Sequence, residues 1–358
     1  MQMNKRKQIT GLLLWTLAAI LLGMLVCYLF LPFFGVQPVD AFRTMILSVF
    51  AERFTMGNIL IKTTPLILTG LAFAFTYKAN LYNIGAQGQF YIGCICAVAV
   101  SLALGGKLPG PAVIILAMLA AMAGGGLTGL VIGFLKARFN ANEFLVSMMS
   151  TYVIIYFMQY LLGSYLQESK HEYLKTNPLD RSTWLPKIIP GTSVSLGIVI
   201  SVIAAIVIWF ILYHTTLGFR VRVTGQNMEA ARLSGIDPHK EFLIAFAISG
   251  AIAGLAGFVE VNGMQHMLLT DFDSSVGSYG IGIAIMASAN PIGIIFAALL
   301  FGLLQVGGTA LAHSTPAPAS IIDLMLGFVM LFVLMSFFFR RKMEIRSMKK
   351  QKLVKEDA

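Results

Sequence analysis

Ten apolar runs, most of them about 20 residues long, constrain the fold of this chain more than any other feature. A helix needs about 20 apolar residues to cross a bilayer, because it rises about 1.5 Å per residue. Only 12% of the residues are charged, which is too few for the polar surface of a soluble domain. We therefore expect an all-α, polytopic transmembrane helical bundle of about ten spans. The runs are Gly11–Phe34, Ile59–Tyr77, Leu81–Leu104, Pro111–Leu135, Phe144–Leu162, Val194–Tyr213, Phe242–Val261, Val276–Ala289, Ile292–Ala312 and Ile321–Phe339.

Two of these runs favour broken or re-entrant segments. Val276–Ala289 is short and rich in glycine, which is typical of a half-helix. Leu81–Leu104 begins with polar residues, so we expect an irregular entry into the membrane. The first run, Gly11–Phe34, has 24 residues and exceeds the apolar part of a signal peptide, about 7–15 residues. It is predicted to remain as the first helix of a single transmembrane domain, 1–358.

The distribution of positive charge predicts the orientation of the bundle. The net charge is +10, and the basic residues flank the apolar runs, which indicates membrane anchoring rather than nucleic-acid binding. If the N-terminus is placed inside, the inner segments contain 18 Lys and Arg residues and the outer segments contain 8. Both termini are therefore expected in the cytoplasm, with 340–358 as a basic cytoplasmic tail.

Motifs of catalysis and metal binding are missing from the sequence. The longest stretches between apolar runs have about 30 residues, too few for an ATPase domain, and no G-x-x-x-x-G-K-[ST] loop occurs. The five histidines are scattered, without an H-E-x-x-H pattern. We expect no enzyme activity and no cofactor bound by this chain. If ATP drives the protein, a separate chain must bind and hydrolyse it.

A polar cluster from Asn80 to Phe90 interrupts the apolar pattern. It contains the amide side chains Asn83, Gln87 and Gln89 beside two glycines. Amides both donate and accept hydrogen bonds, which suits an uncharged solute with hydroxyl or amide groups. Asn83 and Gln87 are four apart and would share one face of a helix. The alternative is an inner turn whose polar residues only satisfy backbone groups.

Three further polar sites are open to two readings. Asn140 or Asn142 is expected to cap the next helix, with Glu143 favourable in its first turn, while Asn142 is also a candidate for the solute path. Glu260 and Asp323 lie at the ends of two runs, where an outer interface is expected and a proton relay is the alternative.

The loop 214–241 is predicted to be a docking element on the cytoplasmic side. Asn227–Ser234 reads as a short helix, Gly235 supplies the left-handed residue that ends it, and Pro238 stops its continuation. A plain connector needs none of these features. The alternative is a surface helix without a partner.

Four motifs resemble one transporter family. Gly225-x-Asn227-x-Glu229–Ala230–Ala231–Arg232-x-x-Gly235 resembles the coupling-helix loop of ABC importer permeases. Tyr82–Gln89 resembles a motif of the branched permease superfamily, which includes ribose, simple-sugar and nucleoside importers. Asn140-x-Asn142–Glu143 and Asn290–Pro291-x-Gly293 match it in order, and the Asn-Ile-Gly form is similar to the nucleoside branch. Tyr279–Ile283 departs from the family, because the usual segment is longer and often acidic.

The resemblance implies a permease subunit of an ATP-driven importer in a bacterial cell membrane, with a nucleoside as solute and a simple sugar as the alternative. It implies three partners: a cytoplasmic ATP-binding subunit, a second permease, and an extracellular solute-binding lipoprotein. The loop residues would couple to the ATPase: Gly225, Asn227, Glu229, Ala230, Ala231, Arg232 and Gly235. An ion-coupled secondary transporter is the rival of another class. It would need a buried acidic pair, for which only Glu260 and Asp323 are candidates.

Overall fold

The structure is a computed structural model that describes residues 18–51, 53–169, 173–189, 191–270, 272, 275–315, 320 and 323–336. The described residues form helices joined by loops, with two isolated β-bridges, Lys175↔Leu269 and Lys187↔Ser195, and no β-strand among them. The predicted all-α class is confirmed. The predicted basic tail, 340–358, lies outside the described residues.

The described helices agree with a polytopic bundle. Seven are long and apolar enough to cross a membrane, and three shorter apolar helices accompany them. The long helices are Thr55–Lys78, Ala86–Leu104, Gly110–Phe139, Glu143–Leu162, Gly197–His214, Pro238–Gln265 and Pro291–Ser314. The shorter ones are Ala18–Phe33, Val276–Met286 and Asp323–Ser336.

The chain divides into two compact units, Met1–Glu52 with Leu303–Ala358, and Arg53–Gly302. In the first, Leu31 of η1 (Leu31–Phe34) and Ala41 of α2 (Pro38–Ala51) pack with Leu311 of α12 (Pro291–Ser314). The apolar runs did not predict α2, because Asp40 and Arg43 interrupt its apolar residues.

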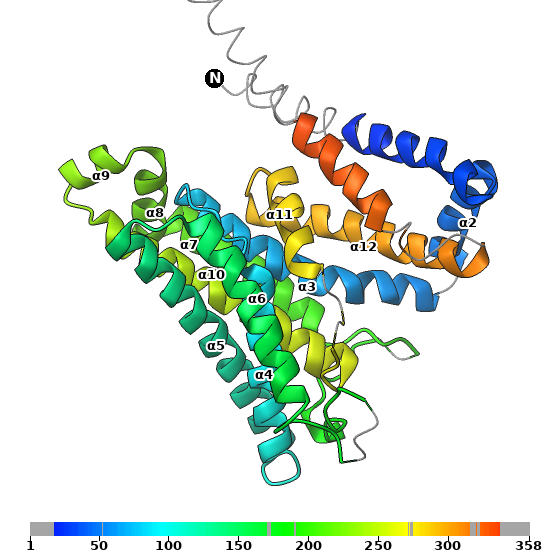
Figure 1. Cartoon of the computed structure of the whole chain (residues 1–358), viewed down its shortest axis with the longest axis horizontal. Helices are drawn as coiled ribbons and strands as arrows, with labels where there is room; N and C mark the ends of the chain where they lie inside the picture. Colours follow the sequence, from blue (N-terminus) through cyan, green and yellow to red (C-terminus); the bar gives the residue numbers. More distant parts are fainter. Residues whose placement is uncertain are drawn as a thin grey trace, which may run out of the picture. The chain divides into compact units, whose positions relative to one another are not determined.

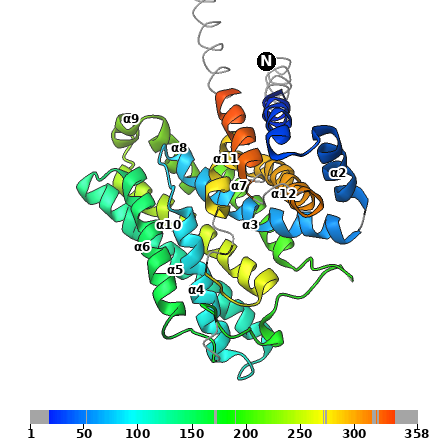
Figure 2. The ribbon, with the colours of Figure 1, turned by 45° about the vertical axis from the view of Figure 1, so that its right-hand side comes forward.

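In the second unit, α3 (Arg53–Lys78) is the central helix, and every residue from Thr63 to Thr76 is buried. Its neighbours include α4 (Ala86–Leu104), α10 (Pro238–Glu260) and α11 (Val276–Met286). Figures 1 and 2 show α4 and α10 running beside α5 (Gly110–Phe139). Such burial on all sides explains why α3 is apolar around its whole circumference.

The contact between α5 and α10 depends on glycine. A Cβ atom on Gly125 would lie 2.2 Å from the carbonyl oxygen of Gly250, and one on Gly129 would lie 2.1 Å from that of Phe246. Small residues four apart let two helix backbones approach this closely in a membrane, where lipid provides no hydrophobic drive for association.

Both segments predicted to be irregular are irregular. Helix α11 has 11 residues, so it is about 16 Å long and cannot cross a bilayer alone. It is separated from α12 by Ser288 and Ala289, both with a positive φ of 52°. Helix α4 begins only at Ala86, after non-helical residues that follow Asn80.

The two long loops of the second unit lie at its opposite ends. Figure 1 shows α8 (Thr216–Gln226) and α9 (Met228–Leu233) at one end, and the described part of 163–196, which includes η2 (Arg181–Thr183), at the other. Helices α6 (Glu143–Leu162) and α7 (Gly197–His214) run between these ends. This arrangement agrees with loops on opposite sides of a membrane.

Candidate functional site

The predicted short helix of the docking loop is present as α9. The Oδ1 atom of Asn227 accepts hydrogen bonds from the backbone N–H groups of Glu229 (3.0 Å) and Ala230 (3.1 Å), so Asn227 is the N-cap. The helix ends at Leu233, and Gly235 follows with a φ of +77°. The predicted short helix and the predicted left-handed glycine are both confirmed, while the cap at Asn227 was not predicted.

Helix α8, which the sequence reading missed, attaches this loop to the bundle. A Cβ atom on Gly225 would lie 2.2 Å from the carbonyl oxygen of Lys78, so α8 packs directly on the end of α3. Gly218 approaches Leu212 of α7 in the same way. Both contacts need glycine because backbone meets backbone. A movement of the loop would therefore be transmitted to α3 and α7.

An ion pair also joins α8 to α10. The Nε atom of Arg220 lies 3.2 Å from Oε1 of Glu241, whose side chain is almost completely buried. Asp237 caps α10 by accepting from the backbone N–H of His239 at 3.0 Å. Sequence reasoning missed the ion pair, since a separation of 21 residues across a loop gives no periodic signal.

The surface of α9 is open to a partner. Ala231 is buried against the bundle, whereas Glu229 and Leu233 are exposed, with Leu233 at 90%. Arg232 lies beside Glu229, with Nη1 3.5 Å from Oε1. An exposed leucine next to a charged residue, on a helix whose opposite side packs on the bundle, is an arrangement that suits docking.

The amides predicted for the solute path are buried in a seam between helices. The Nδ2 atom of Asn83 donates to Oε1 of Gln89 and to Oγ of Ser249, both at 2.8 Å. Ser249 donates in turn to the carbonyl oxygen of Ala72, at 2.7 Å. The seam thus joins α4, α10 and α3. Ser249, a single hydroxyl in an apolar run, gave no signal in the sequence.

Gln87 points elsewhere, so the expectation that it shares a helix face with Asn83 is wrong. Helix α4 begins at Ala86, which leaves Asn83 outside it. Gln87 instead accepts a hydrogen bond from the backbone N–H of Gly277, in the first turn of α11. Residues 81–85, which follow Asn80 with its positive φ, are not helical, and the amides hold the surrounding segments together.

Asn142 is a helix cap in this structure. Its Oδ1 accepts from the backbone N–H groups of Phe144 (3.0 Å) and Leu145 (3.4 Å), at the start of α6. Asn140 ends α5 with a positive φ of 49°. Glu143 forms an ion pair with Lys136, at 2.9 Å, which joins the two helices. Of the two proposed caps, Asn142 is the correct one for α6.

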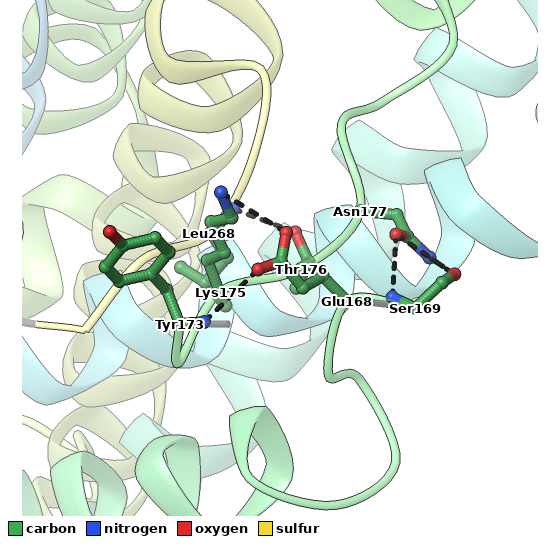
Figure 3. Close-up of polar contacts among 7 residues, drawn as sticks. All are labelled: Glu168, Ser169, Tyr173, Lys175, Thr176, Asn177 and Leu268. Atoms are coloured by element: carbon green, nitrogen blue, oxygen red, sulfur yellow. Dashed lines mark hydrogen bonds and ion pairs between the residues drawn. The ribbon is translucent and has the colours of Figure 1, made fainter. Parts of the chain in front are cut away.

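At the opposite end, the segment 174–185 is hydrogen-bonded to the segment 262–270. Figure 3 shows the contact of Thr176 with Leu268, in which each backbone N–H is a donor. Nearby, Lys175 and Glu168 form an ion pair at 3.2 Å. Because residues 262–270 precede α11 in the chain, this cap of two segments is connected to the half-helix that contacts Gln87.

Polar residues fill the space beneath this cap. Glu260 and Asn262 lie at the end of α10 as expected, but both are buried. Asn262 donates to Oγ of Ser101 and to the carbonyl oxygen of Thr183, both at 2.9 Å. The ring of His266 stacks on Trp184 with centroids 3.7 Å apart. Burial, with a smaller contribution from the positive charge of a nearby lysine, lowers the pKa of His266.

The described residues contain no group of three His, Cys, Asp or Glu placed to hold a metal ion. Their chemistry is that of hydrogen-bonding amides in a bundle of membrane-spanning helices, with a capped helix pair fixed at one end. This combination defines the chain as a multi-pass membrane protein with a helical-bundle architecture.

Comparison with known proteins identifies the family. Residues 55–334 match the family described as "Branched-chain amino acid transport system / permease component", and the chain belongs to that family. The resemblance stated from the motifs is confirmed, and so is a multi-pass membrane location.

Three of the relatives are named as permeases. The chain is 32% identical to the guanosine ABC transporter permease protein NupP of Bacillus subtilis, over 92% of this chain and 94% of that protein. It is 28% identical to the nucleoside ABC transporter permease protein NupB of Lactococcus lactis, over 90% of each. It is 31% identical to the glucose ABC transporter permease protein TsgB13 of Haloferax volcanii, over 86% of this chain and 83% of that protein.

Proposed function

We propose that this chain is the transmembrane permease subunit of an ABC importer that carries nucleosides across a bacterial cell membrane. The main support for this proposal is the nearly full-length similarity to two permeases named for guanosine and nucleosides. The Asn83–Ile84–Gly85 motif agrees with the same branch. Both termini and α9 would lie in the cytoplasm. This orientation is inferred from the distribution of positive charge.

The proposal assigns the loop residues to coupling. A cytoplasmic ATP-binding subunit would contact the exposed face of α9, around Glu229, Ala230 and Arg232. It would bind and hydrolyse ATP, while this chain binds no cofactor. Because Gly225 and Arg220 attach the loop to α3 and α10, movement of α9 would shift the bundle between two access states.

On the outer side, an extracellular solute-binding lipoprotein would bias the same two states, and a second permease, a paralogue or a copy, would complete the path. Asn83, Gln87 and Gln89 are buried here, so a solute would meet them only in another conformation. We expect Asn83→Leu to lower the maximal uptake rate per inserted protein. If total uptake falls only as much as the amount of inserted protein, these residues contribute to folding and not to the solute path.

A simple sugar is the second candidate solute, because the similarity to the glucose permease is nearly as high. An ion-coupled transporter is favoured less, since Glu260 accepts a hydrogen bond from Gln265 at 3.1 Å and so has a local partner.

The experiment is uptake into proteoliposomes that contain the whole transporter and its binding protein. Labelled guanosine, ribose and glucose are compared, with and without ATP. We expect ATP-dependent guanosine uptake, abolished by an ATPase-inactive subunit. If only a sugar is taken up, the solute is a simple sugar and the nucleoside proposal is wrong. Uptake driven by an ion gradient without ATP would refute the class of transporter.

A further inference from the structure

Three tyrosines form an exposed stripe along α6. Tyr152, Tyr156 and Tyr160 are spaced by four residues, so they follow one side of the helix, and their side chains are 50%, 68% and 60% exposed. The opposite side of α6 is covered: Gly88 of α4 approaches the backbone of Thr151, and Met158 is buried. The stripe therefore points away from the bundle of this chain.

The other exposed helices of this unit differ in chemistry. The exposed side chains of α5 include Leu119, Leu127 and Phe134, and those of α7 include Ile203 and Phe210, all of them apolar. Apolar faces of this kind suit the acyl chains of lipid. On α6, three phenol groups are exposed among apolar side chains such as Met149 and Val153, and their hydroxyls have no hydrogen-bond partner among the described residues. A hydroxyl without a partner is unfavourable in hydrocarbon.

The positions along the helix exclude a simple interfacial belt. Tyrosine is common at the headgroup level of a membrane, and Tyr160, near the end of α6, fits that pattern. Tyr152, however, lies nine residues from Glu143 and ten from Leu162, which places it about 14–15 Å from either end of the span. A phenol at that depth needs water, a solute or another protein chain.

We infer that the tyrosine stripe of α6 lines the aqueous path of the solute, where its rings stack on the base of a passing nucleoside. This inference rests on the proposed function. Every base has a π-face, so aromatic stacking binds purines and pyrimidines alike, while the phenol hydroxyls replace hydrogen bonds to water. Residues spaced along a span would hand the base from one ring to the next. A path on this face would be completed by the second permease.

The first test measures access of water to the stripe. Single cysteines are introduced as Tyr152→Cys and Tyr156→Cys in the assembled transporter, with the native cysteines replaced by alanine. The control is Ile203→Cys on α7. A charged, water-soluble thiol reagent should label positions 152 and 156 and not 203, and guanosine should slow the labelling. If positions 152 and 156 are as unreactive as 203, the stripe faces lipid or a packed permease interface, and the inference is wrong.

The second test separates stacking from mere exposure. Tyr156→Phe keeps the ring and should retain most uptake, whereas Tyr156→Leu should lower guanosine uptake about five- to tenfold per inserted protein. Phe210→Leu on α7 is the matched control and should leave uptake unchanged. Wild-type uptake by Tyr156→Leu would refute stacking. If the wild-type transporter carries no nucleoside while positions 152 and 156 are labelled, the proposed substrate and the stacking fail together, and the water-lined path stands.

Discussion

The N-cap of α9 offers the sharpest test of coupling. Replacing Asn227 by alanine removes the Oδ1 atom that accepts from the backbone N–H groups of Glu229 and Ala230. The loss of such a cap costs about 0.5–2 kcal/mol, typically about 1. Because 1 kcal/mol corresponds to a factor of about five at 25 °C, the ratio of ordered to disordered α9 should fall about fivefold.

This loss should matter more here than in a long helix. Helix α9 has six residues, and Ala231 is its only buried residue. Isolated helices shorter than about 12–15 residues are marginal in water, so little else maintains its order. The same change at Asn142, the N-cap of α6, removes a similar stabilisation from a helix of 20 residues, which membrane burial keeps ordered.

The assay combines hydrogen exchange with transport. In Asn227→Ala, the backbone amides from Glu229 to Leu233 should exchange about fivefold faster, and ATP-driven uptake should fall while membrane insertion stays normal. Asn227→Asp keeps the acceptor oxygen and should behave as the wild type, and Asn142→Ala should leave the exchange of α9 unchanged. Wild-type exchange and uptake in Asn227→Ala would show that the cap does not hold the coupling helix.

Three other changes test the rest of the structure. Gly225→Ala would place a methyl group against the carbonyl oxygen of Lys78, so we expect about 1–3 kcal/mol of destabilisation and reduced uptake. Thermal unfolding in detergent measures the destabilisation, and an unchanged melting temperature with unchanged uptake would contradict the contact of α8 with α3. The pKa of His266 is lowered in the folded state, so its neutral ring should contribute its full stabilisation above the unfolded pKa of about 6.5 and less as the pH falls below that value. Melting temperatures of the wild type and of His266→Gln over a pH series measure this contribution. The same dependence of melting temperature on pH in both proteins would refute the role of the buried ring. Single cysteines at Ser169 and at Ser347, which lies outside the described residues, report the topology of a chain that is otherwise free of cysteine. An impermeant thiol reagent on intact cells should label only position 169. Labelling at 347 and not at 169 would overturn the orientation.

Local signals in the sequence were sufficient for the membrane-spanning helices and for the short helix α9. The length of an apolar run decides whether it can cross a bilayer, and this needs no knowledge of its neighbours. The short helix within Asn227–Ser234 and the left-handed Gly235 also depend on residues within one or two turns, so they could be predicted.

The roles of the buried polar groups depend on which helices meet. Asn83 reaches Ser249 across 166 positions of the sequence, and Gln87 reaches Gly277 across 190, so neither partner could be predicted from spacing. The same holds for the tyrosine stripe of α6. A helical pattern shows that its tyrosines share a side, but only the packing of α4 against the other side leaves that side exposed, because burial results from contacts between helices and not from the pattern of one.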